Sequence, residues 1–177
     1  GEAERIPAMT DASTTPSANP VTELPFPPSS LQEFLQLCDG RWMSLRSTFA
    51  LDGSDDWHNS TRGEVTMQHQ SCAAESEQLV VGDGQGKTLS SLSFAADGGL
   101  QRQGEGSQAG ADGRWELREG GCLELSIPGG DGAVVLERIW FTKANLRLRS
   151  TTLVDRDGTP QQANFCSEIR RVSAPST

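Results

Sequence analysis

The chain has 177 residues, of which 34% are hydrophobic and 6% aromatic, with 19 glycines and no tyrosine. This length fits one domain, and the modest apolar content with many glycines favours a β-rich fold. The net charge of −9 argues against nucleic acid and anionic membranes as partners, because like charges repel. No run approaches the roughly 18 apolar residues of a membrane-spanning helix. The N-terminal residues lack the apolar core of a secretory signal, so we expect a cytoplasmic protein.

Residues 1–29 are rich in Ser, Thr, Ala and Pro, without apolar periodicity. This composition predicts a disordered tail. Residues 30–173 are then the folded domain, and residues 174–177 are a short C-terminal tail.

A short helix is expected over residues 31–37, where Leu31, Phe34, Leu35 and Cys38 form one apolar stripe. Ser29 or Ser30 can cap its start, and Asp39-Gly40 ends it. A helix in this position is expected to plug or flank one end of the structure that follows.

Ten short runs separated by turn residues such as Asp52-Gly53 and Asp157-Gly158 follow the helix. They cover residues 41–51, 62–70, 78–81, 88–95, 100–104, 113–118, 122–127, 133–142, 145–154 and 161–172. Runs of this kind predict a ten-stranded antiparallel up-and-down β-barrel, because a long meander closes on itself to remove its exposed edges.

The four cysteines, Cys38, Cys72, Cys122 and Cys166, lie 34, 50 and 44 residues apart. None of these spacings is that of a zinc site, so no metal site is expected. In a cytoplasmic protein they are interpreted as reduced thiols without a catalytic role.

The strand over residues 145–154 can be read in two ways. Alternation places Leu146 and Leu148 on one face and Arg147 and Arg149 on the other. If the leucines face the core, the arginines are solvated. If the strand is turned round, two guanidinium groups enter the cavity, where they could pair with carboxylates of a ligand.

Glu137 shares a strand face with Ile139 and Phe141. Burial among apolar neighbours would raise the pKa of this carboxyl group unless a cation lies close, and Arg147 on the neighbouring strand could be that cation. Such a carboxylate could accept hydrogen bonds from N–H groups of a ligand or pass a proton. A purely structural Glu–Arg cross-strand pair is the alternative.

Three motifs carry a resemblance to the CpcS/CpeS (S-type) phycobiliprotein lyases. They are Glu137-Arg138-Ile139-Trp140-Phe141, Asn145-Leu146-Arg147-Leu148-Arg149 and Phe165-Cys166-Ser167-Glu168-Ile169-Arg170. Residues 34–46, with Gly40-Arg41-Trp42, resemble the helix and first strand of that family, whereas residues 51–130 show little resemblance.

The resemblance implies a lipocalin-like barrel, similar to fatty-acid-binding proteins, with no permanently bound cofactor. Its substrate would be a bilin, phycoerythrobilin or phycocyanobilin, which it helps to attach to a cysteine of a phycobiliprotein α or β subunit. Glu137 and Arg147 would be the catalytic pair that contacts and orients the bilin. The bilin-binding residues would be Arg46, Trp42, Trp140, Arg149 and Glu168.

One departure from the family is that Thr48-Phe49-Ala50 stands where members commonly carry histidines, and the nearest histidine is His58. Two alternatives follow. The chain could be a non-catalytic partner of a heteromeric lyase, or a barrel that carries a bilin or fatty acid without chemistry. The resemblance leaves open a homodimer or a heterodimer with a related lyase.

Overall fold

The computed structural model describes residues 23–104 and 112–172, which form one short helix and ten strands. Residues 1–22 of the predicted N-terminal tail (residues 1–29) and the predicted C-terminal tail, residues 174–177, lie outside the described residues. The elements are α1 (Leu31–Cys38), β1 (Gly40–Ala50), β2 (His58–Ser71), β3 (Glu77–Asp83), β4 (Thr88–Phe94), β5 (Gly99–Gly104), β6 (Gly113–Leu117), β7 (Leu123–Gly130), β8 (Ala133–Lys143), β9 (Leu146–Val154) and β10 (Pro160–Arg170), with a 3₁₀ turn at Ala73–Glu75.

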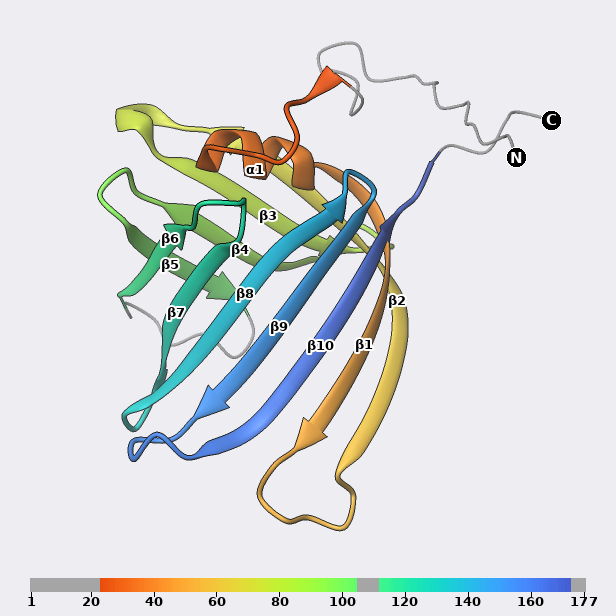
Figure 1. Ribbon diagram of the computed structural model, residues 1–177, viewed down its shortest axis with the longest axis vertical. Coiled ribbons are helices and arrows are strands. Elements are labelled where there is room, and N and C mark those ends of the chain that lie inside the picture. The colour runs from red at the N-terminus through yellow and green to blue at the C-terminus, as the bar shows by residue number, and fades with distance from the viewer. Residues whose placement is uncertain (1–22, 105–111, 173–177) are drawn as a thin grey trace, which may run out of the picture.

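The strands form a closed barrel in which each strand pairs antiparallel with its neighbour in the chain (Figure 1). The last strand, β10, pairs with β1 from Trp42↔Arg170 to Ala50↔Gln162 and closes the ring. The predicted ten-stranded antiparallel up-and-down barrel is therefore confirmed. Turn chemistry places the strands: Gly98 and Gly158 have φ of 98° and 83° in two of the hairpins, a conformation that costs glycine little.

The strand bounds agree with the prediction to within two residues except in β2 and β7, where pairing extends the strands. β2 begins at His58 rather than residue 62, because its first residues continue the ladder with β1 as far as Phe49↔His58. β7 continues into Pro128 and Gly130, which pair with β8 around a bulge.

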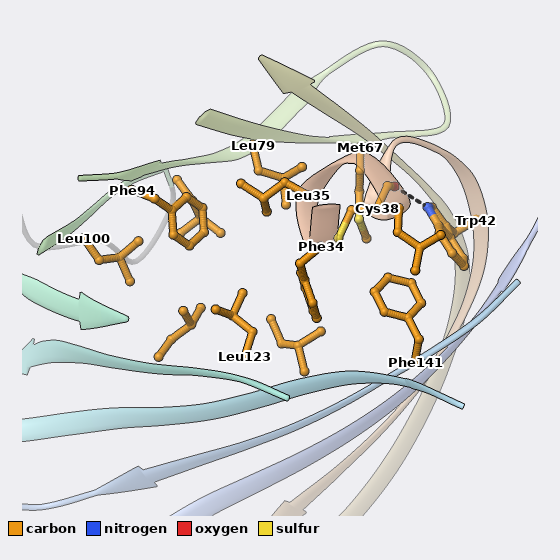
Figure 2. Close-up of a cluster of buried hydrophobic side chains, with 14 residues drawn as sticks. Phe34, Leu35, Cys38, Trp42, Met67, Leu79, Phe94, Leu100, Leu123 and Phe141 are labelled. Carbon is orange, nitrogen blue, oxygen red and sulfur yellow. Dashed lines mark hydrogen bonds between the residues drawn. The ribbon is translucent and has the colours of Figure 1, made fainter. Parts of the chain in front are cut away.

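The helix α1 closes one end of the barrel with its apolar stripe (Figure 2). Ser30 caps it by accepting a hydrogen bond from the Glu33 amide at 3.1 Å. Phe34 packs edge-on against Phe141 of β8, with ring centroids 5.1 Å apart. Leu35 and Leu37 are also buried, and each such side chain contributes about 1.5 to 3 kcal/mol. The helix is thus the plug that the sequence predicted.

The folded part begins before residue 30, the predicted boundary. Leu24 packs against the core and Pro28 is buried, so these two residues belong to the domain rather than to a tail. All four cysteines are free thiols, as predicted, although only Cys38 and Cys166 are buried. None of the helices in the described part of the chain has the length and hydropathy needed to cross a membrane.

Candidate functional site

The interior of the barrel has two different halves. Around α1 the inward side chains are apolar and buried, among them Phe34, Trp42 and Phe141. Toward the other end the inward positions become charged and partly accessible, with Glu137 14% and Arg149 19% exposed. The interior is therefore packed at the α1 end and open to solvent at the other, which we call the open end.

The arginines of β9 point into the barrel. Arg147 and Arg149 share the inward face with Thr151, while Leu146 and Leu148 face outward, so the cavity-facing interpretation of this strand is correct. The inward charges form one ion-pair network, which consists of Glu137, Arg147, Arg149 and Glu168.

The inner part of the network is the buried pair of Arg147 and Glu168, which are 4% and 1% exposed. Their side chains are hydrogen-bonded from β9 to β10, directly across from each other in the register. Arg147 is almost completely shielded from solvent. In this structure it supports the site from the packed α1 end and does not line the site.

The outer part of the network consists of Arg149 and Glu137. Arg149 Nη1 donates to Glu137 Oε2 at 3.1 Å, and Thr151 Oγ1 donates to the same oxygen at 2.7 Å. The other nitrogen, Nη2, lies 3.5 Å from Glu168 Oε2 and 3.4 Å from Cys166 Sγ. Arg149 therefore links both carboxylates, and the predicted Glu137–Arg147 pair is wrong.

The register explains this difference. The turn at Ala144 places Glu137 opposite Thr151 and Phe141 opposite Arg147. Arg147 thus lies four residues along the ladder from Glu137, whereas Arg149 lies only two residues away on the same face. The position of the turn in the sequence therefore already indicates that Arg149 lies nearer to Glu137 than Arg147 does.

Both carboxyl groups are held in the charged form. Burial alone would raise the pKa of Glu137, but Arg149 and the Thr151 hydroxyl outweigh it and keep that pKa below its ordinary value. For Glu168, burial is likewise outweighed by Arg147 and Arg149, and the pKa is lowered. The carboxylates in turn raise the pKa of both guanidinium groups despite burial. Glu137 is therefore suited to accept hydrogen bonds rather than to donate a proton.

Arg46 lies on the inward face of β1, opposite Cys166 of β10, and is exposed at the open end. None of the ion pairs among the described residues uses it. Its charge is therefore available to an anionic group entering from solvent.

The two tryptophans predicted to wall the pocket have other positions. Trp42 faces inward but is fully buried at the α1 end, where its Nε1 donates to the Cys38 carbonyl at 2.8 Å and Arg170 stacks on its ring at 4.2 Å. Trp140 faces outward and contacts Phe165 at 6.3 Å between centroids, because it alternates with the inward Ile139 and Phe141. The prediction that Trp140 lines the cavity is wrong.

Three inward residues of this half were not predicted as site residues. Thr151 orients Glu137, and Cys166 contacts Arg149. Asn164 lies opposite Thr151, and its buried Oδ1 has no hydrogen-bond partner within the described part of the chain. The period of two along β9 and β10 would have identified them, since they share faces with Arg149 and Glu168.

His58 does not replace the absent first-strand histidines. It is the first residue of β2 and stacks on the outward Phe49, with centroids 4.8 Å apart. Within the described ranges no three His, Cys, Asp or Glu side chains cluster closely enough to hold a metal ion.

A groove of about 430 Å³ lies outside the barrel over β6 to β9. Its acidic residues Glu116 and Glu124 already pair with Arg118, and Glu124 also pairs with Arg138. Its charges are therefore satisfied within the protein, whereas Arg46 at the open end has no such partner among the described residues. The interior is the better candidate site.

A closed barrel with a packed end and an accessible charged end defines a ligand-binding β-barrel. Comparison of this chain with known proteins identifies the particular family. The family model of CpeS-like proteins matches residues 95–171. Chromophore lyase CpcS/CpeS 1 of Paulinella chromatophora is 44% identical over 156 residues, which cover 87% of this chain and 95% of the relative. This chain belongs to the CpcS/CpeS family of chromophore lyases.

Two further relatives are more distant. Chromophore lyase CpcS/CpeS of Thermosynechococcus vestitus (strain NIES-2133 / IAM M-273 / BP-1) is 32% identical over 75% of this chain and 62% of the relative. The solved S-type phycobiliprotein lyase CPES of Guillardia theta superposes with a TM-score of 0.57 at 22% identity, covering 82% of this chain and 95% of that structure. At that identity, the second match supports the fold alone.

Proposed function

We propose that this chromophore lyase binds an open-chain tetrapyrrole, phycoerythrobilin or phycocyanobilin, in the open half of its barrel and promotes its attachment to a cysteine of a phycobiliprotein α or β subunit. The observation that carries the proposal is the partly accessible Glu137–Arg149 pair, with the exposed Arg46 in the same row of the barrel as Arg149. A bilin offers matching chemistry, because it has pyrrole N–H donors along its conjugated length and two propionates.

Glu137 and Arg149 are assigned different tasks. The ionised Glu137 accepts hydrogen bonds from pyrrole N–H groups and so favours the protonated tetrapyrrole. Arg149 is held by two carboxylates, and therefore keeps Glu137 ionised and in place. Arg46 takes a propionate at the open end, since guanidinium groups pair bidentately with carboxylates.

The reaction is an addition. The acceptor thiolate forms a C–S bond to the ethylidene carbon of ring A, the π electrons of that double bond move into the ring, and a proton is added there. No group leaves and no oxidant is required. Protonation of the tetrapyrrole makes the attacked carbon more electrophilic, so the lyase contributes position and charge stabilisation and needs no cysteine of its own.

The first experiment is a titration of the protein with each bilin, followed by absorbance. We expect a red-shifted, sharpened band, and no spectral change with either bilin would overturn the proposal. Arg46→Ala should weaken binding by about tenfold, as expected for loss of one charged hydrogen bond. Arg62→Ala is the matched control, because Arg62 is exposed on the outer face of β2 next to Leu45.

A second experiment separates a lyase from a carrier or a partner subunit. Bilin-loaded protein is incubated with an acceptor subunit, with and without a related lyase chain, and covalent product is measured after denaturation. Product formed by this chain alone indicates an independent lyase. Product only with the second chain indicates a heteromeric one, and binding without any product indicates a carrier.

A further inference from the structure

The hairpin that joins β1 and β2 carries a group of aromatic rings that the proposed bilin site does not use. We call this group the rim aromatic cluster, and it consists of Phe49, Trp57 and His58. The centroid of the Phe49 ring lies 4.8 Å from that of His58 and 6.3 Å from that of Trp57, and the Trp57 and His58 centroids are 5.5 Å apart. Trp57 is nevertheless 58% exposed. So large an apolar side chain, stacked with other rings and open to water, marks an interaction surface.

The rim aromatic cluster lies at the open end of the barrel and faces outward. The hairpin between β1 and β2 is at the edge of the barrel farthest from α1 (Figure 1). Phe49 is three residues from the inward Arg46, an odd number that puts it on the outer face, about 10 Å along the strand. It is paired there with His58. A molecule that binds the cluster from outside is thus held beside the cavity without entering it.

Backbone hydrogen bonds fix the base of this hairpin. The Ala50 amide donates to the Trp57 carbonyl, and the Leu51 amide donates to the Gln161 carbonyl next to it in β10, both at 2.9 Å. The hairpin is therefore fastened to β10 as well as to its own strands. Rings that are already stacked and held in place lose little conformational freedom when a partner binds. Tryptophan is also among the residues most enriched at the energetic centre of protein interfaces.

The turns around the rim aromatic cluster are acidic. Three of the turns at the open end join β1 to β2, β7 to β8 and β9 to β10, at residues 51–57, 131–132 and 155–159. Their charged residues are six aspartates and one arginine, namely Asp52, Asp55, Asp56, Asp131, Asp155, Asp157 and Arg156. None of the ion pairs among the described residues uses them. Aromatic rings among negative charges favour a partner whose surface is both apolar and basic.

The chemistry of the reaction identifies such a partner, an argument that rests on the proposed function. The acceptor cysteine attacks as a thiolate, and nearby cations favour the thiolate form. The part of the acceptor that receives the bilin also has to pair with two propionates, which requires arginine or lysine. The acceptor is therefore expected to be basic and apolar around its cysteine before the bilin is attached. That cysteine also has to reach the open end, where the cluster lies.

We propose that the rim aromatic cluster, with the aspartates beside it, is the docking surface for the phycobiliprotein acceptor subunit. Trp57 enters an apolar pocket next to the acceptor cysteine, and the aspartates face the cations around that pocket. Docking at this place brings the cysteine to the mouth of the barrel that holds the bilin.

The test is the affinity of the full chain for bilin-free α and β acceptor subunits, measured by biolayer interferometry without bilin. Trp57→Ala should raise the dissociation constant by about 30-fold, the effect of losing a central tryptophan. The double variant Asp55→Lys/Asp56→Lys should raise it by about tenfold, and wild-type binding should weaken as salt is added, because exposed charges are screened. Phe26→Ala should leave it unchanged. Phe26 is the matched control, a 46% exposed aromatic residue just before α1, at the other end of the barrel.

Wild-type protein that binds neither subunit at about 100 µM overturns the proposal, and so does an affinity that both rim variants leave unchanged. An equal loss in Phe26→Ala would also overturn it, because the loss would then not be specific to the rim. Thermal melting shows whether each variant folds, and the double aspartate variant decides if Trp57→Ala does not.

The bilin titration of Trp57→Ala separates docking from chromophore binding. It should match wild type, because the ring lies outside the cavity. Weaker bilin binding in Trp57→Ala would mean that the ring covers the cavity, and would overturn the docking role. The acceptor measurement contains no bilin, so a failed bilin titration would refute the proposed function while a Trp57-dependent affinity for the acceptor still stood.

Discussion

Arg147 and Arg149 are two residues apart on one strand, but their burial gives them different roles. Arg147 is enclosed with Glu168, and breaking such a pair leaves a buried charge at a cost of about 3 to 5 kcal/mol. We therefore predict that Arg147→Ala lowers the free energy of unfolding by about that amount, measured by urea denaturation. Any loss of bilin affinity in this variant would then follow from loss of structure.

Arg46→Ala should lower bilin affinity without the loss of stability that we predict for Arg147→Ala. Arg46 is exposed and makes none of the ion pairs of the described residues, so its stability should stay within about 0.5 kcal/mol of wild type while bilin affinity falls. A large stability loss in Arg46→Ala, or none in Arg147→Ala, would contradict the division between a supporting and a ligand-contacting arginine.

The lowered pKa values of Glu137 and Glu168 predict acid sensitivity. A carboxyl group with a folded pKa below its unfolded value stabilises the protein above the unfolded pKa, near 4.5, and this contribution is lost as pH falls through the folded pKa. The unfolding free energy should thus be level from neutral pH to about 5 and fall below about 4.5.

The matched variant for this prediction is Glu137→Gln, which keeps the shape of the side chain but cannot titrate. Urea unfolding at pH 3 to 7 should show a shallower acid limb for Glu137→Gln than for wild type, by at most about 1.4 kcal/mol per pH unit for one proton. Equal slopes would mean that Glu137 has an ordinary pKa in the folded protein.

At the scale of elements, Arg170 of β10 holds α1 against the barrel. Its Nη1 and Nη2 donate to the Asp39 and Leu37 carbonyls at 2.6 and 2.5 Å, and its Nε donates to Asn145 Oδ1 at 2.9 Å. The planar guanidinium also covers the Trp42 ring. One side chain therefore ties the end of α1 and the β8–β9 turn to the last strand.

We predict that Arg170→Lys lowers the melting temperature although the positive charge is kept, because an ammonium group cannot make these spread contacts at once. The loss should be about 2 to 3 kcal/mol. Arg171→Lys is the neighbouring control, since Arg171 points outward and is mostly exposed. If both variants melted at the wild-type temperature, Arg170 would not be the link between α1 and the barrel.

The sequence predicts the strands well but does not decide the direction of every side chain. Turn residues and alternation predicted all ten strands, because a hairpin glycine and a period of two are local properties. The direction of β9 was left open, since its leucines and arginines alternate equally well either way. Only the assembled barrel shows that the arginines line a polar interior and the leucines join Trp140 on the outer face.

The prediction of which charged residues pair was wrong for a related reason. Glu137 and Arg147 were matched because their strands are neighbours and because the family resemblance implies this pair, whereas the ladder that starts at Ala144 brings Glu137 to Arg149. Trp140 was placed inside through its family motif, although its own strand alternation with Ile139 predicts the outer face. In both cases the register outweighed the resemblance.

At the scale of the whole molecule, the barrel combines a packed end with an open one, and this limits its stability without ligand. Arg46, which makes no ion pair with the described residues, gains a charged partner only when a ligand enters. A ligand that binds the folded chain alone raises its unfolding free energy by RT ln(1 + [L]/Kd), about 2.7 kcal/mol at a hundredfold excess over Kd.

We therefore predict that phycocyanobilin or phycoerythrobilin raises the melting temperature in a concentration-dependent way, by roughly 5 °C at that excess. A long-chain fatty acid at equal concentration should raise it less, because one carboxylate engages Arg46 but offers no N–H donor to Glu137. Differential scanning fluorimetry on tryptophan emission measures both. If the fatty acid stabilised the barrel as much as the bilin did, the carrier function would be the better description. The Glu137→Gln variant sharpens this comparison, since it should reduce the bilin effect and leave the fatty-acid effect unchanged.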